Sequence, residues 1–126
     1  CVDNLFTFIK DQIVGYGYEK DDIIVTGSVL PTIRDCTDKG FLNGARKDVD
    51  VSQLKRTKKT LEYNFILESR CLEYGYKYMD ITNETIGING TIHEKFLSKD
   101  KYDHHLDSEI TYGIWMSKLK DMFFCH

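Results

Sequence analysis

The sequence predicts an α/β fold in which helices cover both faces of a parallel sheet, a three-layer α/β/α arrangement. Two short runs, Ile23–Gly27 and Tyr76–Ile81, are rich in β-branched and aromatic residues and lack regular polar alternation. Such runs are typical of strands buried on both faces. Amphipathic helical segments precede, separate and follow them, and this order is typical of a parallel sheet with helical crossovers. With 126 residues, of which 41% are hydrophobic, the chain fits one domain or part of one.

The first half of the chain contains one helix, one strand and a long loop. Apolar residues recur at helical spacing over Val2–Val14, and the glycines of Gly15–Gly17 end this helix. The strand Ile23–Gly27 follows, and Pro31 closes it. The polar segment Thr32–Asp50 is predicted to be a loop, of a length that is usually functional or mobile.

The longest helix is predicted over Ser52–Tyr74, with Ser52 as its N-cap and Gly75 at its end. Helical spacing indicates which apolar side chains face the core. The expected buried stripe consists of Leu54, Leu61, Phe65 and Leu72.

The second strand, Tyr76–Ile81, precedes a segment that lacks long regular elements. Residues 83–90 are rich in turn formers, Ile92–Leu97 is predicted to be a short helix, and Ser98–Asp107 is a loop. Ser108 begins the last helix.

The two strands are expected to be parallel neighbours joined by a right-handed crossover through the long helix. Two strands of this kind leave their outer edges unpaired. We therefore expect residues 1–126 to be the C-terminal portion of a single domain, whose remainder, or another subunit, completes the sheet. Expressed alone, the chain should be poorly folded, aggregated or tightly oligomeric.

Composition excludes several classes of partner. The net charge is −3 and basic residues form no run longer than two, so a nucleic-acid partner is not expected. No apolar stretch approaches the length of a membrane span. The four cysteines are scattered without a C-x-x-C pair, which favours reduced thiols and a cytoplasmic location. We expect no cofactor.

The loop Ser98–Asp107 contains the residues best suited to chemistry. A histidine beside a carboxylate is the general-base unit of nucleophilic hydrolysis, because the carboxylate fixes the imidazole tautomer and stabilises the imidazolium. Asp103 and His105 are candidates for such a pair. Taken alone, an Asp-His-His pattern on a polar loop is more simply interpreted as a solvated surface turn.

The wider context of this loop resembles the last portion of the SGNH/GDSL serine-hydrolase family. The strand segment IIVTGSVLP is followed by a helix that carries Asn64 and by the strand Gly75–Ile81. A turn with Asn89–Gly90 and the final pair His105–Leu106 complete the resemblance, which covers nearly the whole chain. It implies the flavodoxin-like three-layer fold of that family.

The resemblance also implies a function, the hydrolysis or transfer of an ester-linked acyl group on a small-molecule or glycan substrate. His105 would be the general base and Asp103 would orient it. The family's nucleophilic serine and oxyanion donors belong upstream of Ile23 and have no counterpart in residues 1–22. The family usually has three residues from Asp to His rather than two, so His104 and Asp100 remain alternatives.

Other polar residues have a functional and a plain interpretation. Ser28 is a candidate nucleophile at a strand end, although the following Pro31 favours a simple turn. A charged group in the first loop is either an anion-recognising lid or a solvated surface, and we favour the surface. It comprises Arg34, Asp35, Arg46 and Lys47. We expect no metal site among the histidines, because the side chains of adjacent histidines diverge. They are His93, His104, His105 and His126.

Two rival functions come from other classes. The first is a non-catalytic binding module that keeps the fold and has lost the active site, which the irregular Asp-to-His spacing favours. The second is a flavodoxin-like signalling or nucleotide-binding domain. The lack of a glycine-rich phosphate loop after Val25 argues against this second rival.

Overall fold

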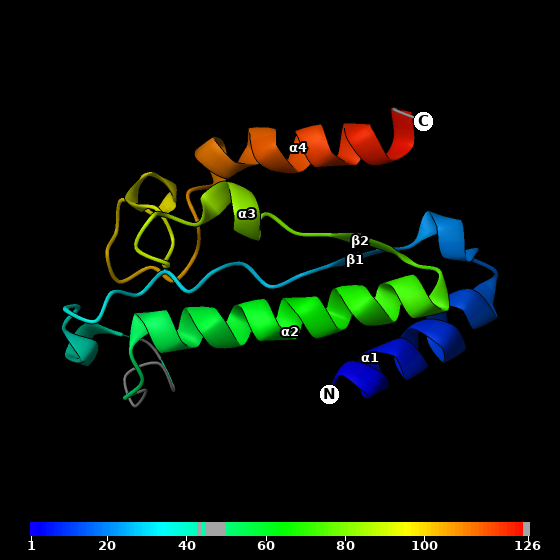
Figure 1. Ribbon diagram of the computed structural model, residues 1–126, viewed down its shortest axis with the longest axis horizontal. Coiled ribbons are helices and arrows are strands. Elements are labelled where there is room, and N and C mark those ends of the chain that lie inside the picture. Colours follow the sequence, from blue (N-terminus) through cyan, green and yellow to red (C-terminus); the bar gives the residue numbers. More distant parts are fainter. Residues whose placement is uncertain (43, 45–49, 125–126) are drawn as a thin grey trace. The chain divides into compact units, whose positions relative to one another are not determined.

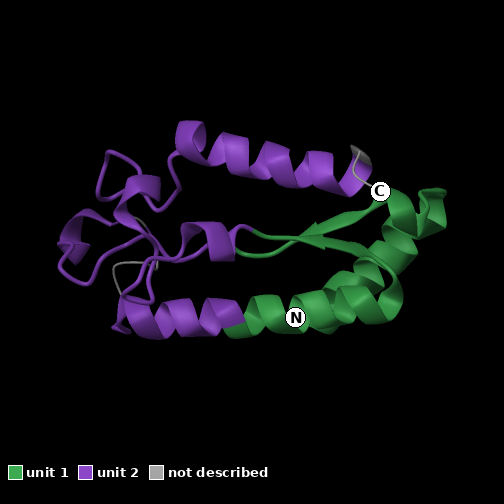
Figure 2. Ribbon diagram, turned by 45° about the horizontal axis from the view of Figure 1, so that its top comes forward, with its two compact units in different colours: residues 1–28, 62–80 green, residues 29–61, 81–126 purple. Residues whose placement is uncertain are grey.

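The computed structural model describes residues 1–42, 44 and 50–124, and the chain divides into two compact units. Unit 1 comprises residues 1–28 and 62–80, and unit 2 comprises residues 29–61 and 81–126 (Figure 2). Figure 1 labels the main helices and the two strands along the chain. The long helix α2, Gln53–Tyr74, contributes residues to both units. Among the described residues, no helix has the length and apolar character needed to cross a membrane.

Unit 1 begins with the expected N-terminal helix, whose hydrogen bonding changes along its length. The α-helix α1 covers Val2–Phe8, a π-helical segment covers Ile9–Ile13, and a 3₁₀ turn covers Val14–Tyr16. Gly17 then takes a left-handed conformation, with φ of 103°. Because side chains other than glycine rarely adopt this conformation, Gly17 ends the helix where the sequence predicts an end.

The two strands of unit 1 form a parallel pair, as predicted. Strand β1, Ile24–Thr26, pairs with strand β2, Lys77–Met79, and Val25 lies opposite Tyr78. The N–H of Gly27 extends the pairing by donating to the Met79 carbonyl at 2.9 Å. The fold is thus a mixture of helices and a small parallel sheet. The third layer, further strands and the right-handed crossover stay predictions.

The core of unit 1 joins α1, the sheet and the second half of α2. The Phe6 ring lies 5.2 Å from the Tyr74 ring and 5.9 Å from the Tyr76 ring. Burial of each such side chain contributes roughly 1.5–3 kcal/mol. The buried cluster consists of Phe6, Ile9, Ile23, Val25, Leu67, Cys71 and Tyr76.

The buried face of α2 differs from the predicted one. Phe65 is 71% exposed and Leu72 is 84% exposed, so the prediction that these two residues are buried is wrong. Leu54 is also exposed, and Leu61 is half-buried. The true buried face recurs at helical spacing too, but three of its five residues are polar. It consists of Gln53, Thr57, Asn64, Leu67 and Cys71.

Asn64 shows why a polar residue occupies this face. It is 3% exposed, its Oδ1 accepts from the Ser28 N–H at 2.8 Å, and its Nδ2 donates to the Ser28 carbonyl at 2.8 Å. Ser28 lies just beyond β1, so its backbone groups have no partner in the two-stranded ladder. The buried amide of Asn64 therefore takes the place that a neighbouring strand would have at this point.

Unit 2 contains less regular structure around a smaller core. It includes 3₁₀ turns at Lys39–Phe41 and Glu94–Phe96, the short helix α3 at Thr82–Thr85, and the helix α4 at Ser108–Phe124. The predicted start of the last helix at Ser108 is therefore confirmed. The sequence predicts only turns over residues 83–90, whereas residues 83–85 belong to the helix α3. The core cluster consists of Leu30, Ile92 and Phe96, with Leu61, Ile86, Leu97, Leu106 and Ile114 packed against it.

Gly27 is predicted to be essential for the packing of unit 1. An added Cβ there would lie 2.3 Å from the Tyr78 hydroxyl, 2.9 Å from the Asp80 Cβ and 3.0 Å from the Asn64 Cγ. Gly27→Ala should therefore lower the free energy of unfolding by about 1–3 kcal/mol, the usual cost of overpacking. Urea denaturation followed by circular dichroism measures this change.

The same substitution at Gly113 is the matched control. Gly113 lies within α4, and a Cβ added there would meet no tertiary contact within 4 Å among the described residues. Gly113→Ala should raise the free energy of unfolding by about 0.5–1 kcal/mol, because alanine loses less backbone entropy in a helix. Equal effects of the two substitutions would contradict the packing described for Gly27.

Candidate functional site

The loop that carries the candidate pair is closed at its base within unit 2. Leu97 and Leu106 form an antiparallel bridge, and the Asp107 N–H donates to the Phe96 carbonyl at 2.9 Å. The loop between these residues is thus held at both ends by backbone hydrogen bonds. The contacts that close its base join residues near in sequence.

The three aspartates of the loop have different structural roles. Asp100 accepts from the Tyr102 N–H at 3.0 Å, which forms a local turn. Asp107 accepts from the N–H groups of Glu109 and Ile110 at 3.0 and 3.2 Å, and so caps α4. Asp103 is the one whose carboxylate bonds a histidine within the described part of the chain. The alternative that Asp100 orients the histidine is therefore not favoured.

Asp103 and His105 form a direct side-chain hydrogen bond. The Oδ1 of Asp103 lies 2.7 Å from the Nδ1 of His105 and also accepts from the His105 N–H at 3.0 Å. The His105 side chain is 72% exposed, whereas that of Asp103 is 35% exposed. The carboxylate therefore holds one side of the ring and leaves most of it accessible.

These hydrogen bonds stabilise the ionised carboxylate. The pKa of Asp103 is lowered, first by the His105 N–H and second by the His105 side chain, with a smaller contribution from a Ser98 hydrogen bond. An ionised carboxylate has no proton to donate, so Nδ1 of His105 must be the donor. It follows that neutral His105 carries its lone pair on Nε2, as a general base requires.

His104 lies closer to His105 than the sequence predicts. The two imidazole centroids are 3.9 Å apart with planes tilted by 40°, so the expectation that adjacent side chains diverge is wrong. The carbonyl of His104 accepts from the Thr32 hydroxyl at 2.8 Å, which joins this loop to the segment that follows β1. Because Oδ1 of Asp103 is already engaged by two groups of His105, the geometry favours His105 as the partner.

Among the described residues, the side chains of Asp103, His104 and His105 form a group that could hold a metal ion. One ligand atom each from Asp103, His104 and His105 lie within 4.8 Å of one another. Asp103 already accepts two hydrogen bonds, and the group is partly exposed. His93 has another role, because its Nδ1 accepts from the Lys95 N–H at 3.1 Å at the start of a 3₁₀ turn. His126 lies outside the described residues.

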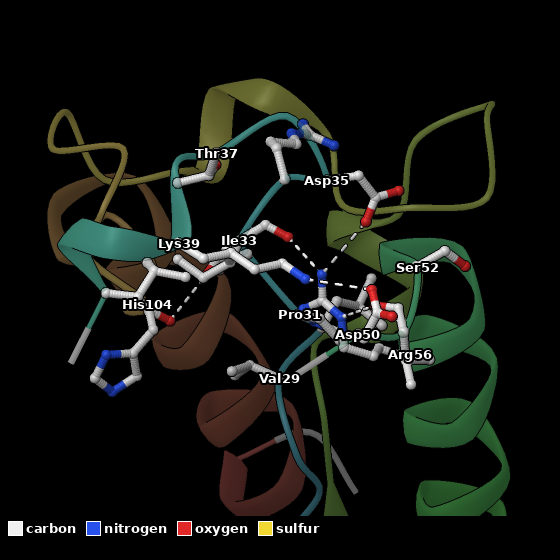
Figure 3. A pocket seen from close by; sticks show the side chains of 15 residues that line it. Val29, Pro31, Ile33, Asp35, Thr37, Lys39, Asp50, Ser52, Arg56 and His104 are labelled. Atoms are coloured by element: carbon white, nitrogen blue, oxygen red, sulfur yellow. Dashed lines mark hydrogen bonds and ion pairs between the residues drawn. The ribbon is translucent and has the colours of Figure 1, made fainter. Parts of the chain in front are cut away.

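A pocket of about 470 Å³ in unit 2 borders this loop (Figure 3). Apolar residues such as Val29, Pro31 and Ile33 form part of its wall, and His104 lies at its side. It also contains paired charges, since Lys39 lies 3.5 Å from Asp50. The volume is within the range of small-molecule sites, so the pocket can admit a compact ligand.

The charged residues of the first loop fix its backbone to α2. Arg34 is half-buried and donates to Gln53, to Thr91 and to the Ile92 carbonyl, at 3.1, 3.2 and 3.1 Å. Asp35 accepts from the Gln53 N–H at 2.7 Å, at the first turn of the helix. Arg34 therefore bonds to other parts of unit 2, which neither the lid interpretation nor the solvated-surface interpretation predicts.

Arg56 makes the same kind of attachment from the helix side. It donates to the carbonyls of Val51 and Ile33 at 3.0 and 2.7 Å, and lies 3.8 Å from Asp35 (Figure 3). No motif in the sequence distinguishes Arg56 from the other basic residues of the helix. The remaining charged residues of the group, Arg46 and Lys47, lie outside the described residues.

Unit 1 contains a polar cluster that the sequence motifs do not reveal. The Tyr78 hydroxyl donates to the Asp80 carboxylate at 2.6 Å, beside Gly27. Burial first, and then this hydrogen bond, raise the pKa of Tyr78 well above its usual range. Tyr78 therefore stays protonated and keeps donating. A glycine directly after a buried strand is the available signal, because it often marks close backbone approach.

Ser28 and Cys71, also in unit 1, show no sign of nucleophilic activation. Ser28 is exposed, and residues 28–34 contain no helix, so the strand-to-helix elbow needed for a nucleophile is not formed. Cys71 is fully buried, and burial followed by the charge of Glu68 raises its pKa to about 11. Because the thiolate is the reactive form, Cys71 is inert near neutral pH.

The lowered pKa of Asp103 can be tested by carbon-detected NMR of its carboxyl group. We expect a titration below the usual range of aspartate. His105→Ala should move this pKa upward only part of the way, because the backbone N–H at position 105 remains. Bonding of the ionised form should stabilise the loop above the usual aspartate pKa, and this stabilisation should disappear as the pH falls through the lowered pKa. An Asp103 pKa unchanged by His105→Ala would contradict the side-chain bond.

No protein-family model, curated protein or solved structure matches the chain.

Proposed function

We propose that this chain supplies the general-base pair of an ester hydrolase, with His105 as the base and Asp103 as the residue that orients it. The 2.7 Å contact between Asp103 Oδ1 and His105 Nδ1 is the observation that carries the proposal. A small-molecule or glycan ester is the proposed substrate, and this substrate class rests on the resemblance to SGNH/GDSL hydrolases.

The proposed reaction uses both ring nitrogens of His105. Nε2 removes the proton from a serine hydroxyl as the oxygen attacks the ester carbonyl, and Nδ1–H keeps its bond to Asp103. The imidazolium so formed lies beside an ionised carboxylate, which stabilises it. It then returns the proton to the departing alcohol, and a water molecule releases the acyl group by the same steps in reverse order.

The proposal requires a nucleophilic serine and oxyanion donors from sequence outside this chain. Ser28 is the one serine at a strand end considered above, and it lacks the geometry of an activated nucleophile. Donors placed around the developing oxyanion typically contribute roughly 10²–10³-fold to the rate in such reactions. The pair described above thus accounts for the proton transfers alone.

The rival function is a non-catalytic binding module, and the pocket favours it. The pocket borders the segment that follows β1 and the start of α2. Its charged residues include Arg56, which bonds the Val51 carbonyl and lies near Asp35, and the ion pair of Lys39 with Asp50. A ligand can be held there without any proton transfer by His105. Loss of ester turnover in a His105 variant separates the two functions.

The test uses the intact protein that carries this chain, assayed on a short-chain p-nitrophenyl ester. His105→Ala should lower kcat by roughly 10³–10⁴-fold, the usual cost of losing a member of such a unit. Asp103→Asn should also lower kcat by orders of magnitude, because the amide can donate to Nδ1 and so favour the wrong tautomer. A fluorophosphonate probe should label a serine in the native protein and fail to label the His105 variant.

Two histidine variants are the controls. His93→Ala removes an exposed histidine outside the pair and should leave kcat unchanged. His104→Ala should reduce kcat by less than about tenfold, since the bond between Asp103 and His105 does not require the His104 ring. An equal loss of kcat in His104→Ala would assign the role of general base to His104. Full activity in His105→Ala would end the assignment and leave the binding module.

A further inference from the structure

The side chains of Asp103, His104 and His105 bring together the ligand types that bind zinc. Each residue offers one ligand atom, a carboxylate oxygen or a ring nitrogen, and these atoms lie within 4.8 Å of one another. Two imidazoles and one carboxylate are a ligand set of catalytic zinc sites, where water takes the fourth position. Divergence of adjacent histidines is the reason to expect no metal here, yet the two ring centroids are 3.9 Å apart. That reason therefore does not apply to this loop.

The separation of the three ligand atoms is close to the separation needed around a zinc ion. Zinc bonds nitrogen and oxygen ligands at roughly 2.0–2.2 Å, so its tetrahedral ligands lie about 3.3–3.6 Å apart. Two ligand atoms at the 4.8 Å limit must therefore approach each other by about 1.5 Å. The side chain of His105 is 72% exposed, so rotation about its side-chain bonds can supply this movement.

Asp103 can bind an ion and still hold the backbone of the loop. Its Oδ1 accepts from the His105 N–H at 3.0 Å, a bond that involves no ring atom. An ionised carboxylate has about four lone-pair sites, so a bond to zinc can be added to this contact. The backbone of the loop need not change for an ion to bind.

A zinc ion on either ring nitrogen of His105 removes the lone pair that a general base needs. At Nε2, the metal occupies this lone pair directly. At Nδ1, the metal replaces the hydrogen bond to Asp103, and the single N–H proton of the neutral ring then resides on Nε2. In both cases Nε2 cannot accept the proton of a serine hydroxyl, and the ring neither gains nor loses a proton.

We propose that Asp103, His104 and His105 form an inhibitory zinc site, whose occupation switches off the general base. The inhibition rests on the proposed function of His105, whereas the binding of zinc does not. Imidazole nitrogens favour zinc over magnesium and calcium, which prefer oxygen ligands. The His104 ring is a ligand in this site but is not a member of the general-base pair. Substitution of His104 therefore separates metal binding from the reaction.

The test of binding is a titration of the intact protein that carries this chain with zinc chloride, followed by calorimetry and by NMR of the histidine rings. Zinc should shift the ring signals of His104 and His105 and leave those of His93 in place. His104→Phe keeps an aromatic ring beside His105 but removes the ligand nitrogen. It should weaken binding at least as much as the loss of an outer-sphere partner does, roughly 10–100-fold.

Two controls accompany this titration. His93→Phe makes the same change at an exposed histidine outside the site, and should leave zinc binding unchanged. Magnesium chloride and calcium chloride should not shift the ring signals of His104 and His105. Ring signals of these two residues that zinc leaves unshifted would overturn the zinc site, whatever the turnover.

Ester turnover tests the inhibition and keeps it distinguishable from the proposed function. Saturating zinc should lower kcat of the native protein to near that of His105→Ala, and EDTA should restore it. His104→Phe should keep, in zinc, the kcat that it has without zinc. Shifted rings with undiminished turnover, in a protein that His105→Ala inactivates, would overturn the inhibition. Full activity in His105→Ala would end both the general base and its inhibition, while the ring signals would still decide on the zinc site.

Discussion

The backbone N–H and C=O groups of residues 28–33, the segment that follows β1, need hydrogen-bond partners. This need determines much of the structure. Residues 28–33 lie beyond the described strand pair, and several of their N–H and C=O groups bond to side chains instead. Within unit 1, Asn64 bonds both backbone groups of Ser28. Within unit 2, the side chain of Gln53 donates to the Pro31 carbonyl at 2.9 Å, and Arg56 donates to the Ile33 carbonyl at 2.7 Å.

This requirement explains why the buried face of α2 is largely polar. A helix that packs on a completed sheet meets backbone groups that are already paired, and its buried face can be apolar throughout. Here α2 meets an extended segment with unpaired groups, and amide and guanidinium side chains replace the missing partners. The apolar side chains Phe65 and Leu72 lie on another side of α2 and are exposed.

The sequence predicted where the helices and strands lie better than it predicted which side of the helix α2 is buried. Parallel pairing of Ile23–Gly27 with Tyr76–Ile81 followed from their apolar, β-branched character, and the structure confirms it with shorter strands. The predicted stripe of α2 is wrong because hydrophobic periodicity alone cannot reveal a buried face built from Asn64 and Gln53. The hydrogen bond between Asp103 and His105 follows from local spacing, whereas the pocket depends on residues far apart in the sequence.

The bonds that shape the Asp103–His105 pair are short-range, and this has a consequence for how the pair arises. Asp103 bonds a residue two positions away, Asp100 does the same, and the bridge Leu97–Leu106 closes the segment. Such contacts cost little loop-closure entropy, so the pair can assemble early, before long-range packing is complete. The Thr32–His104 hydrogen bond, which spans 72 residues, can then form last and attach the finished loop to the rest of unit 2.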